Sequence, residues 1–319
     1  MKNSFVFILN IINIEGELPI EVAPRHFFQK ADAEQIDKIK KMLDIFVPFG
    51  FLKILNIRPY EVDIIKVPGE KPSSFSFKYE PLPEDKWRYW VILFEGTNKE
   101  LQDIESAAFL LKHDIELGFT IFGKNSLSSG EGYGWHTPSL FSFFDSPSSN
   151  EPAVLVSTNE IREIPENYHL IKKISLDHEH ITRAFRKLRD LKSLPRLSEL
   201  VTTGYFSIIE SLVTHNPNLT ESSDSLKHQI RTKIPLLSKR FQRKIDYNEY
   251  FNESNEETIW KKLYDYRSCI VHGEHANFIG SLQILKDAKT VREFLYETVK
   301  LLLLLALREP IFLTDLKKC

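Results

Sequence analysis

Cysteine is scarce in this chain of 319 residues, which contains only Cys269 and Cys319. Two thiols are too few for a disulfide framework or for a cysteine cluster that holds zinc. The closely spaced histidines of "DHEH" (177–180) and "HGEH" (272–275) do not supply a metal site either, because neither has the H-E-x-x-H spacing. We therefore expect a protein of the reducing cytoplasm that binds no metal and no cofactor.

Long hydrophobic runs are also missing. The run "LLLLLAL" (301–307) is far shorter than the roughly 20 residues that cross a bilayer. It predicts the buried part of a C-terminal helix, so we expect no membrane partner. The apolar start, 1–22, lacks a small-residue cleavage site, and we expect no signal peptide.

Glycine is infrequent, with 12 in the whole chain. The glycines of "GEGYG" (130–134) do not stand between a strand and a helix, as a phosphate-binding loop requires. No Walker motif and no G-x-S-x-G motif is present. These absences exclude the common signatures of nucleotide hydrolases and serine hydrolases.

The net charge of −2 conceals two halves of opposite sign. Residues 1–169 carry 17 Lys and Arg against 25 Asp and Glu, which is −8, and residues 170–319 carry 25 against 19, which is +6. Such a split indicates two domains, with an anionic partner on the second. The alternative is chance segregation of solvated charges.

The first half mixes strand-like and helix-like segments. Helical periodicity covers 31–47 and 99–115. Short β-branched or aromatic runs bounded by turn residues predict strands at 4–14, 60–67, 73–80, 87–96, 117–123, 140–144 and 153–157. We therefore expect a β-rich α+β domain over residues 1–172.

Helical patterns dominate the second half. They cover 175–193, 196–214, 226–244, 256–272 and 281–308. This is typical of a helical bundle, which we expect over residues 173–319. The fold class is therefore α+β: a β-rich mixed domain followed by an all-α bundle.

The helix expected at 256–272 contains an anomaly. It has no Pro or Gly until Gly273, which we expect to cap its C-terminus. Its apolar stripe comprises Trp260, Leu263, Tyr264, Ile270 and Val271. Arg267 falls near the middle of that stripe, where a permanently charged guanidinium requires a carboxylate or an anionic ligand.

Glu210 is the carboxylate that best meets this requirement. On the 196–214 helix it shares a side with Phe206 and Val213, so it is also a charge among apolar residues. We expect Glu210 and Arg267 to meet across the bundle, with paired hydrogen bonds fixing the guanidinium. The alternative role is a buried ion pair that only sets the helix register.

His272 adds a group that can exchange protons near neutral pH. It follows Arg267 by five residues, about 140° around the helix, so the two side chains converge only at a helix end or between two copies of the chain. A base that deprotonates a ribose 2′-OH and an arginine that stabilises the attacked phosphate suffice to cleave RNA without a metal.

These residues carry a resemblance to a known family. The R-x-x-x-x-H element in "YDYRSCIVHG", the helix containing "FSIIESLV" and the break before the motif resemble HEPN domains, in particular the Apea-like HEPN group. The resemblance covers roughly 177–315. It implies an up-and-down bundle that dimerises with its motifs facing one another, and metal-independent endoribonuclease activity in phage defence or a toxin system.

The resemblance also implies roles for single residues. Arg267 and His272 match the motif, Glu210 corresponds to the acidic residue of the second helix, and Ser268 stands at the polar position after the arginine. We expect these four to be catalytic. The alternative is an inactive module that dimerises or binds RNA or a nucleotide. With a catalytic bundle, we expect the N-terminal domain to sense, recruit or restrain, with a phage or regulatory ligand.

A basic segment lies between Lys227 and Lys244 and contains no acidic residue. Such a segment favours a phosphate backbone, with binding that weakens as salt rises. The RNA-binding residues expected there are Lys233, Lys239, Arg240, Arg243 and Lys244. The alternative is a solvated helix face.

Overall fold

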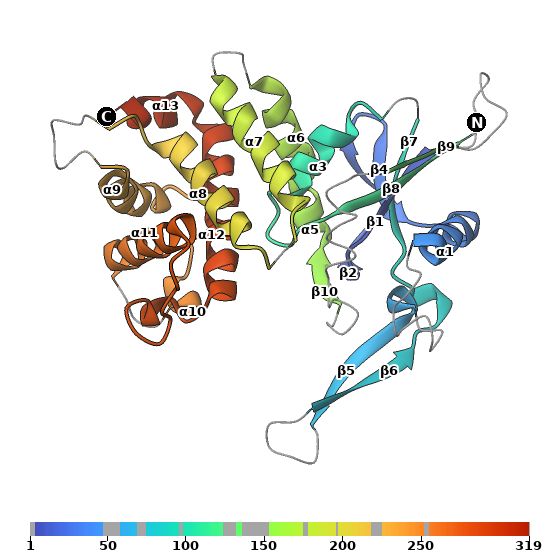
Figure 1. Ribbon diagram of the computed structural model, residues 1–319. Coiled ribbons are helices and arrows are strands. Elements are labelled where there is room, and N and C mark those ends of the chain that lie inside the picture. The colour runs from blue at the N-terminus through green and yellow to red at the C-terminus, as the bar shows by residue number, and fades with distance from the viewer. Residues whose placement is uncertain are drawn as a thin grey trace. The chain divides into compact units, whose positions relative to one another are not determined.

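The computed structural model describes residues 4–46, 58–68, 75–95, 98–123, 132–135, 153–174, 178–195, 197–217, 225–251 and 255–318. The chain forms two compact units, Met1–Tyr168 and His169–Cys319. Strands concentrate in the first unit and helices in the second (Figure 1). The expected α+β class, a β-rich region followed by a helical region, is confirmed.

A six-stranded sheet organises the N-terminal unit. Its strand order is β3-β4-β7-β1-β8-β9, and every neighbouring pair is antiparallel. The strands are β1 (Ser4–Ile8), β3 (Ile20–Ala23), β4 (His26–Lys30), β7 (Trp90–Phe94), β8 (Leu117–Phe122) and β9 (Gly132–Trp135). Two small sheets pair β2 (Ile12–Glu15) with β10 (Val154–Ser157) and β5 (Val62–Pro68) with β6 (Phe75–Pro81).

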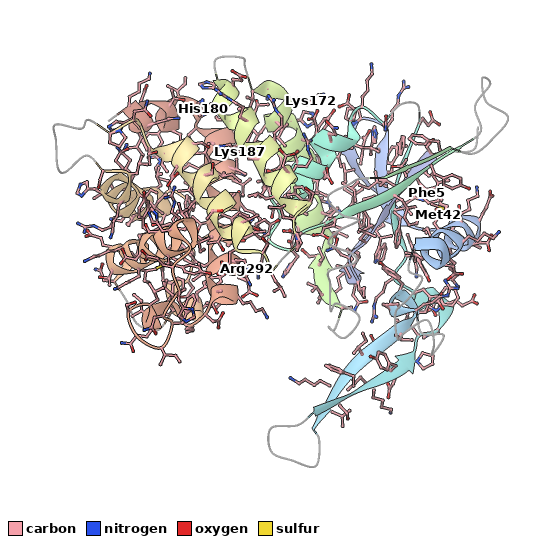
Figure 2. All side chains as sticks on the ribbon, in the orientation of Figure 1. Phe5, Met42, Lys172, His180, Lys187 and Arg292 are labelled. Atoms are coloured by element: carbon pink, nitrogen blue, oxygen red, sulfur yellow. The ribbon has the colours of Figure 1, made fainter. Side chains whose placement is uncertain are left out.

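One face of this sheet is covered by α1 (Ala33–Phe46). Ile39 and Met42 of the helix belong to the same buried cluster as Phe5 and Phe7 of β1, and Figure 2 labels Phe5 and Met42. Burying several such side chains gives the domain a core of its own. The remaining helices of the unit are α3 (Leu101–Ala108), α5 (Thr158–Ile161) and α6 (Glu163–Lys173), the last of which contains the boundary between the units.

The strand predictions succeed where β-branched runs are long. The runs at 60–67, 73–80, 87–96, 117–123 and 153–157 overlap β5, β6, β7, β8 and β10. Strands β3 and β4 were not expected, because prolines and charged residues interrupt their short apolar pattern. Strand β9 was not expected either, because Gly132 and Gly134 are typical of a turn. The run at 140–144 lies outside the described residues.

The C-terminal unit is a set of packed helices. They are α7 (Glu179–Lys192), α8 (Glu199–Val213), α9 (Leu226–Ser238), α10 (Tyr247–Tyr250), α11 (Glu256–His272), α12 (Ala288–Arg308) and α13 (Pro310–Lys318). Helix α8 packs against α7, α9, α11, α12 and α13, which places it at the centre of the bundle. The expected burial of 301–307 within a C-terminal helix is confirmed, since every one of these residues is buried in α12.

No helix in the described ranges is both long and apolar enough to cross a membrane.

An aromatic cluster joins α10, α11 and α12. Phe294 of α12 is fully buried, and its ring centroid lies 5.2 Å from Tyr247, 4.9 Å from Phe251 and 5.6 Å from Trp260. The Trp260 indole N–H donates to the Tyr247 hydroxyl at 3.1 Å. Edge and tilted contacts of this kind add to the area burial of each ring. The cluster therefore anchors the N-terminal half of α11 and leaves its C-terminal half to carry the motif.

Candidate functional site

Helix α11 holds the motif between two well-formed caps. The Asn255 side chain accepts hydrogen bonds from the Glu257 and Thr258 amides at its start. At its end Gly273 adopts a left-handed conformation with φ 70°, and its N–H donates to the Ile270 carbonyl at 3.2 Å. The Glu274 N–H donates to the Cys269 carbonyl at 2.8 Å, which completes a Schellman motif. The expected helix and its glycine cap are both confirmed.

The apolar stripe of α11 differs from the expected one at its C-terminal end. Trp260 and Leu263 are fully buried, whereas Tyr264 and Ile270 are half-buried and Val271 is 51% exposed. The helix packs on α8 and α9. Val271 belongs to the apolar stripe of the sequence but not to the buried face of the helix, because the last turn extends beyond the core.

Arg267 meets Glu210 across the contact between α11 and α8. An Arg267 terminal nitrogen, Nη2, lies 3.6 Å from Glu210 Oε1, and the two side chains are 26% and 17% exposed. The predicted pairing of these two charges is therefore confirmed. It resolves the anomaly of α11, since each ion lowers the cost of burying the other.

The pair does not form the paired hydrogen bonds expected of it. Glu210 Oε1 and Arg267 Nε are both buried, and neither has a hydrogen-bond partner among the described residues. A separation of 3.6 Å is also longer than a hydrogen bond. That part of the prediction is wrong, since the helices hold the two groups slightly apart. Both groups therefore keep unused hydrogen-bonding capacity.

Burial controls the electrostatics of Glu210. Desolvation raises the pKa of this carboxyl above its ordinary value, and the positive charges of Arg267 and Lys187 oppose the rise. Burial likewise raises the pKa of Tyr264, whose ring lies 5.5 Å from the Arg267 guanidinium carbon. The Glu210 carboxylate and the Tyr264 ring thus lie beside the Arg267 guanidinium, and both stabilise its positive charge.

We expect Glu210→Gln to remove a pH dependence of stability. The folded protein holds the Glu210 proton more tightly than the unfolded chain, because the folded pKa is raised. The free energy of unfolding therefore falls as pH rises from the ordinary carboxyl range through the raised pKa. Urea unfolding of wild type and Glu210→Gln from acidic to neutral pH measures this fall, which the variant lacks. Glu249→Gln, at an exposed position, is the control. Parallel profiles for wild type and Glu210→Gln would contradict the expectation.

His272 lies apart from the ion pair within one chain. It is exposed at the last position of α11, and its side chain forms no hydrogen bond or ion pair with another described residue. Ser268 is half-buried directly after Arg267. The structure therefore brings Arg267 and Glu210 together, while the exposed His272 side chain is accessible from outside the chain.

Lys233 is not available to RNA. It is 7% exposed within α9, and its ammonium donates to the Val213 carbonyl at 3.1 Å and to the Gln229 side chain at 3.5 Å. The prediction that Lys233 binds RNA is wrong, because its side chain points into the bundle and satisfies the C-terminal end of α8.

The two arginines of the basic segment that were expected to bind RNA are paired with carboxylates. Arg240 lies 2.6 Å from Glu309, and Arg243 lies 3.3 Å from Glu297. These pairs reduce the positive charge that the segment presents to a phosphate. Their acidic partners come from α12 and the residue that follows it, far from the segment in sequence.

Lys239 and Lys244 are exposed. Their expected role in RNA binding stays a prediction.

Lys187 is a residue that sequence reasoning missed. It is exposed on α7, its ammonium donates to the Ser207 hydroxyl of α8 at 2.9 Å, and its charge acts on Glu210. The sequence did contain a signal, since Arg183 and Lys187 stand four residues apart on one helix face. Their relation to Glu210 depends on the packing of α7 on α8.

The described residues contain no group of three or more His, Cys, Asp or Glu that could hold a metal ion. Comparisons of the chain with protein families, with curated proteins and with solved structures gave no match. The resemblance to HEPN domains therefore stays a prediction.

Proposed function

We propose that this protein is a metal-independent endoribonuclease of the cytoplasm that acts as a homodimer through its C-terminal bundle. The observation that carries the proposal is the Arg267–Glu210 pair between α11 and α8, with His272 exposed at the end of the same helix. A partly exposed cation held beside a carboxylate is suited to a phosphate whose charge increases during the reaction.

The chemistry needs one proton acceptor and one proton donor. His272 takes the proton of a ribose 2′-OH, and the oxygen attacks the adjacent phosphorus. The bond to the 5′-oxygen breaks, and that oxygen takes a proton from water as it leaves. The products are a 2′,3′-cyclic phosphate and a 5′-hydroxyl end. DNA lacks the attacking hydroxyl, so the reaction is confined to RNA.

Three further residues complete the proposed site: Arg267, Glu210 and Ser268. Arg267 stabilises the negative charge on the phosphate oxygens. Glu210 is a positioning residue, because it lies beside the guanidinium rather than beside the substrate. Ser268 offers a hydroxyl to the phosphate at the position after Arg267.

A second copy of the chain brings Arg267 and His272 to one phosphate. Within one helix they point about 140° apart and lie about 7.5 Å apart along the axis. Exposed apolar side chains, Val271 at 51% and Ile279 at 95%, lie close in sequence to His272 and offer area for a partner copy. Two α11 helices that face one another would place the arginine of one copy near the histidine of the other.

Two inactive variants are therefore expected to restore activity when they are mixed. A heterodimer of Arg267→Ala and His272→Ala contains one site in which both residues are intact, because each copy supplies the residue that the other lacks. Co-refolded mixtures should regain up to about half of the wild-type activity per heterodimer, measured as RNA cleavage. Each variant refolded alone is the control. A mixture as inactive as its components would contradict a site shared between copies.

The biological setting is proposed on the resemblance alone. A ribonuclease of phage defence or of a toxin system needs restraint, and we assign sensing or restraint, with a phage or regulatory ligand, to the N-terminal domain. The alternative function is an inactive module that dimerises or binds RNA or a nucleotide. This alternative holds if no second copy brings an arginine to the exposed His272 side chain.

Cleavage of labelled total RNA in EDTA tests the proposal. The purified wild-type protein should cut RNA with the metal chelated, while Arg267→Ala should be slower by about 10²- to 10³-fold. Arg267→Lys keeps the charge and tests the need for the planar group. Absence of cleavage by folded, dimeric wild type would favour the inactive module, and equal cleavage by wild type and Arg267→Ala would place the site elsewhere.

A further inference from the structure

Three cations gather where α7 and α13 pack on α8. They are Arg183 and Lys187 of α7 and Lys317 of α13, here named the α7–α13 cluster. His180, Arg183 and Lys187 follow an i, i+3, i+7 spacing, so they form one stripe along α7. Figure 2 labels His180 and Lys187 on this helix. The stripe borders the buried residues Ile181, Ala184 and Leu188, so it lies at the edge of the helix packing.

Helix α8 fixes two of these cations on one side. The Lys187 ammonium donates to the Ser207 hydroxyl at 2.9 Å, and the Lys317 ammonium donates to the Ser211 carbonyl at 2.7 Å. Ser207 and Ser211 are four residues, about one helical turn, apart along α8. The two ammonium groups are thus held beside neighbouring turns of α8, where both can meet one phosphate backbone.

The acceptors of both ammonium groups are neutral, so their charge is not cancelled by these bonds. Burial lowers the pKa of Lys317, and the charges of Arg183 and Lys187 lower it further. Burial also lowers the pKa of His180, with further contributions from Lys317, His178 and Arg183. The cations are therefore close enough to repel one another, and an anion would relieve that repulsion.

The basic segment 227–244 offers a contrast. Lys227 lies 2.5 Å from Asp265 and Arg231 lies 3.7 Å from Glu257, in addition to the pairs of Arg240 and Arg243. In the cluster Arg183 pairs with its exposed helix neighbour Glu179 at 3.7 Å. Exposed pairs of that length are weak. Among the described residues, the ion pairs of Lys227, Arg240 and Arg243 in the segment are therefore closer than the one ion pair of the cluster.

The cluster also connects with the candidate site. Lys187 and Arg267 both act on Glu210, which lies on α8 between Ser207 and Ser211. We infer that Arg183, Lys187 and Lys317 bind the phosphate backbone of single-stranded RNA and lead it toward Arg267. This inference rests on the proposed function for the identity of the ligand. The cations, their fixed positions and their continuity with Arg267 carry the rest.

Salt-dependent binding tests the inference. The full chain carrying His272→Ala, which keeps the RNA intact, is titrated with a fluorescent single-stranded RNA at several salt concentrations. Adding Arg183→Gln, Lys187→Gln and Lys317→Gln should weaken binding and reduce the steepness of log K against log salt by about 2, since each phosphate contact contributes about 0.7. A separate variant of the parent, with Lys187→Arg and Lys317→Arg, keeps all three positive charges. Its slope of log K against log salt should equal that of the parent.

The matched control removes three exposed lysines elsewhere, with Lys261→Gln, Lys286→Gln and Lys289→Gln. Its slope should equal that of the parent. An unchanged slope in the cluster variant, a loss in the control instead, or no RNA binding by the parent would each overturn the inference. Binding through the cluster by a wild-type protein that never cleaves RNA would leave the inference standing and remove the proposed function. RNA cleavage by wild type, together with unchanged RNA binding by the cluster variant, would keep the proposed function and overturn the inference.

Discussion

Replacing His272 with alanine is expected to slow RNA cleavage by about 10²- to 10⁴-fold, the contribution of a general acid–base group. The free energy of unfolding should change by less than about 0.5 kcal/mol, because the side chain is exposed and lies outside the core. Single-turnover cleavage of a labelled RNA, together with urea unfolding of the same preparations, measures both quantities. An activity loss without a stability loss separates a catalytic residue from a structural one.

The chain supplies a close control for this prediction. His275 is also exposed and lies three residues further along, beyond the Gly273 cap. We expect His275→Ala to cleave RNA at the wild-type rate. If His272→Ala cleaves as fast as wild type, the proton transfer assigned to His272 is wrong, whatever the activity of the protein.

Replacing Phe294 with alanine is expected to destabilise the C-terminal unit by about 3–5 kcal/mol. Phe294 is fully buried, and four aromatic side chains from α10, α11 and the residue after α10 surround it. Removing the ring leaves a cavity that rigid neighbouring rings do not fill easily. Urea unfolding followed by the helical circular dichroism signal measures the loss.

Phe312→Ala on α13 is the matched control, because that ring is 37% exposed. It contacts the Arg240 guanidinium at 4.6 Å, so we expect a loss of at most about 1 kcal/mol. Equal losses for the two variants would mean that the aromatic cluster does not anchor α11. The motif would then depend on other contacts for its position.

The sequence was sufficient to predict features that depend on local pattern. Helix α11 runs over the expected residues because an Asn cap, an uninterrupted apolar period and a terminal glycine all agree. The Arg267–Glu210 pair could be expected because each charge stands on an apolar face, where an opposite charge is the simplest partner. The α+β class follows from the change in periodicity between the halves.

Features that depend on distant residues could not be predicted. Arg243 and Arg240 are paired with Glu297 and Glu309, which lie 54 and 69 residues away, so the basic segment is less positive than its sequence indicates. Lys317 joins Lys187 only because α13 and α7 pack on the same helix. No periodicity or local motif contains that information.

Lys233 shows a third reason for a wrong prediction. A lysine on an amphipathic helix is usually solvated, but here its ammonium reaches the last turn of α8 and bonds to the Val213 carbonyl. The apolar part of a lysine stem tolerates burial when its charged end finds such an acceptor. The direction of the side chain depends on helix packing, which composition does not determine.

Cleavage of an RNA with one 2′-deoxynucleotide at the preferred cleavage position tests the central claim most directly. The cleavage position is first mapped with wild-type protein in EDTA, and the unmodified RNA is the control. The 2′-hydroxyl is the attacking group in the proposed reaction, so the modified RNA should stay intact at that position, and the unmodified products should end in a 2′,3′-cyclic phosphate and a 5′-hydroxyl. Cleavage at the modified position, or products that end in a 3′-hydroxyl and a 5′-phosphate, would contradict the account.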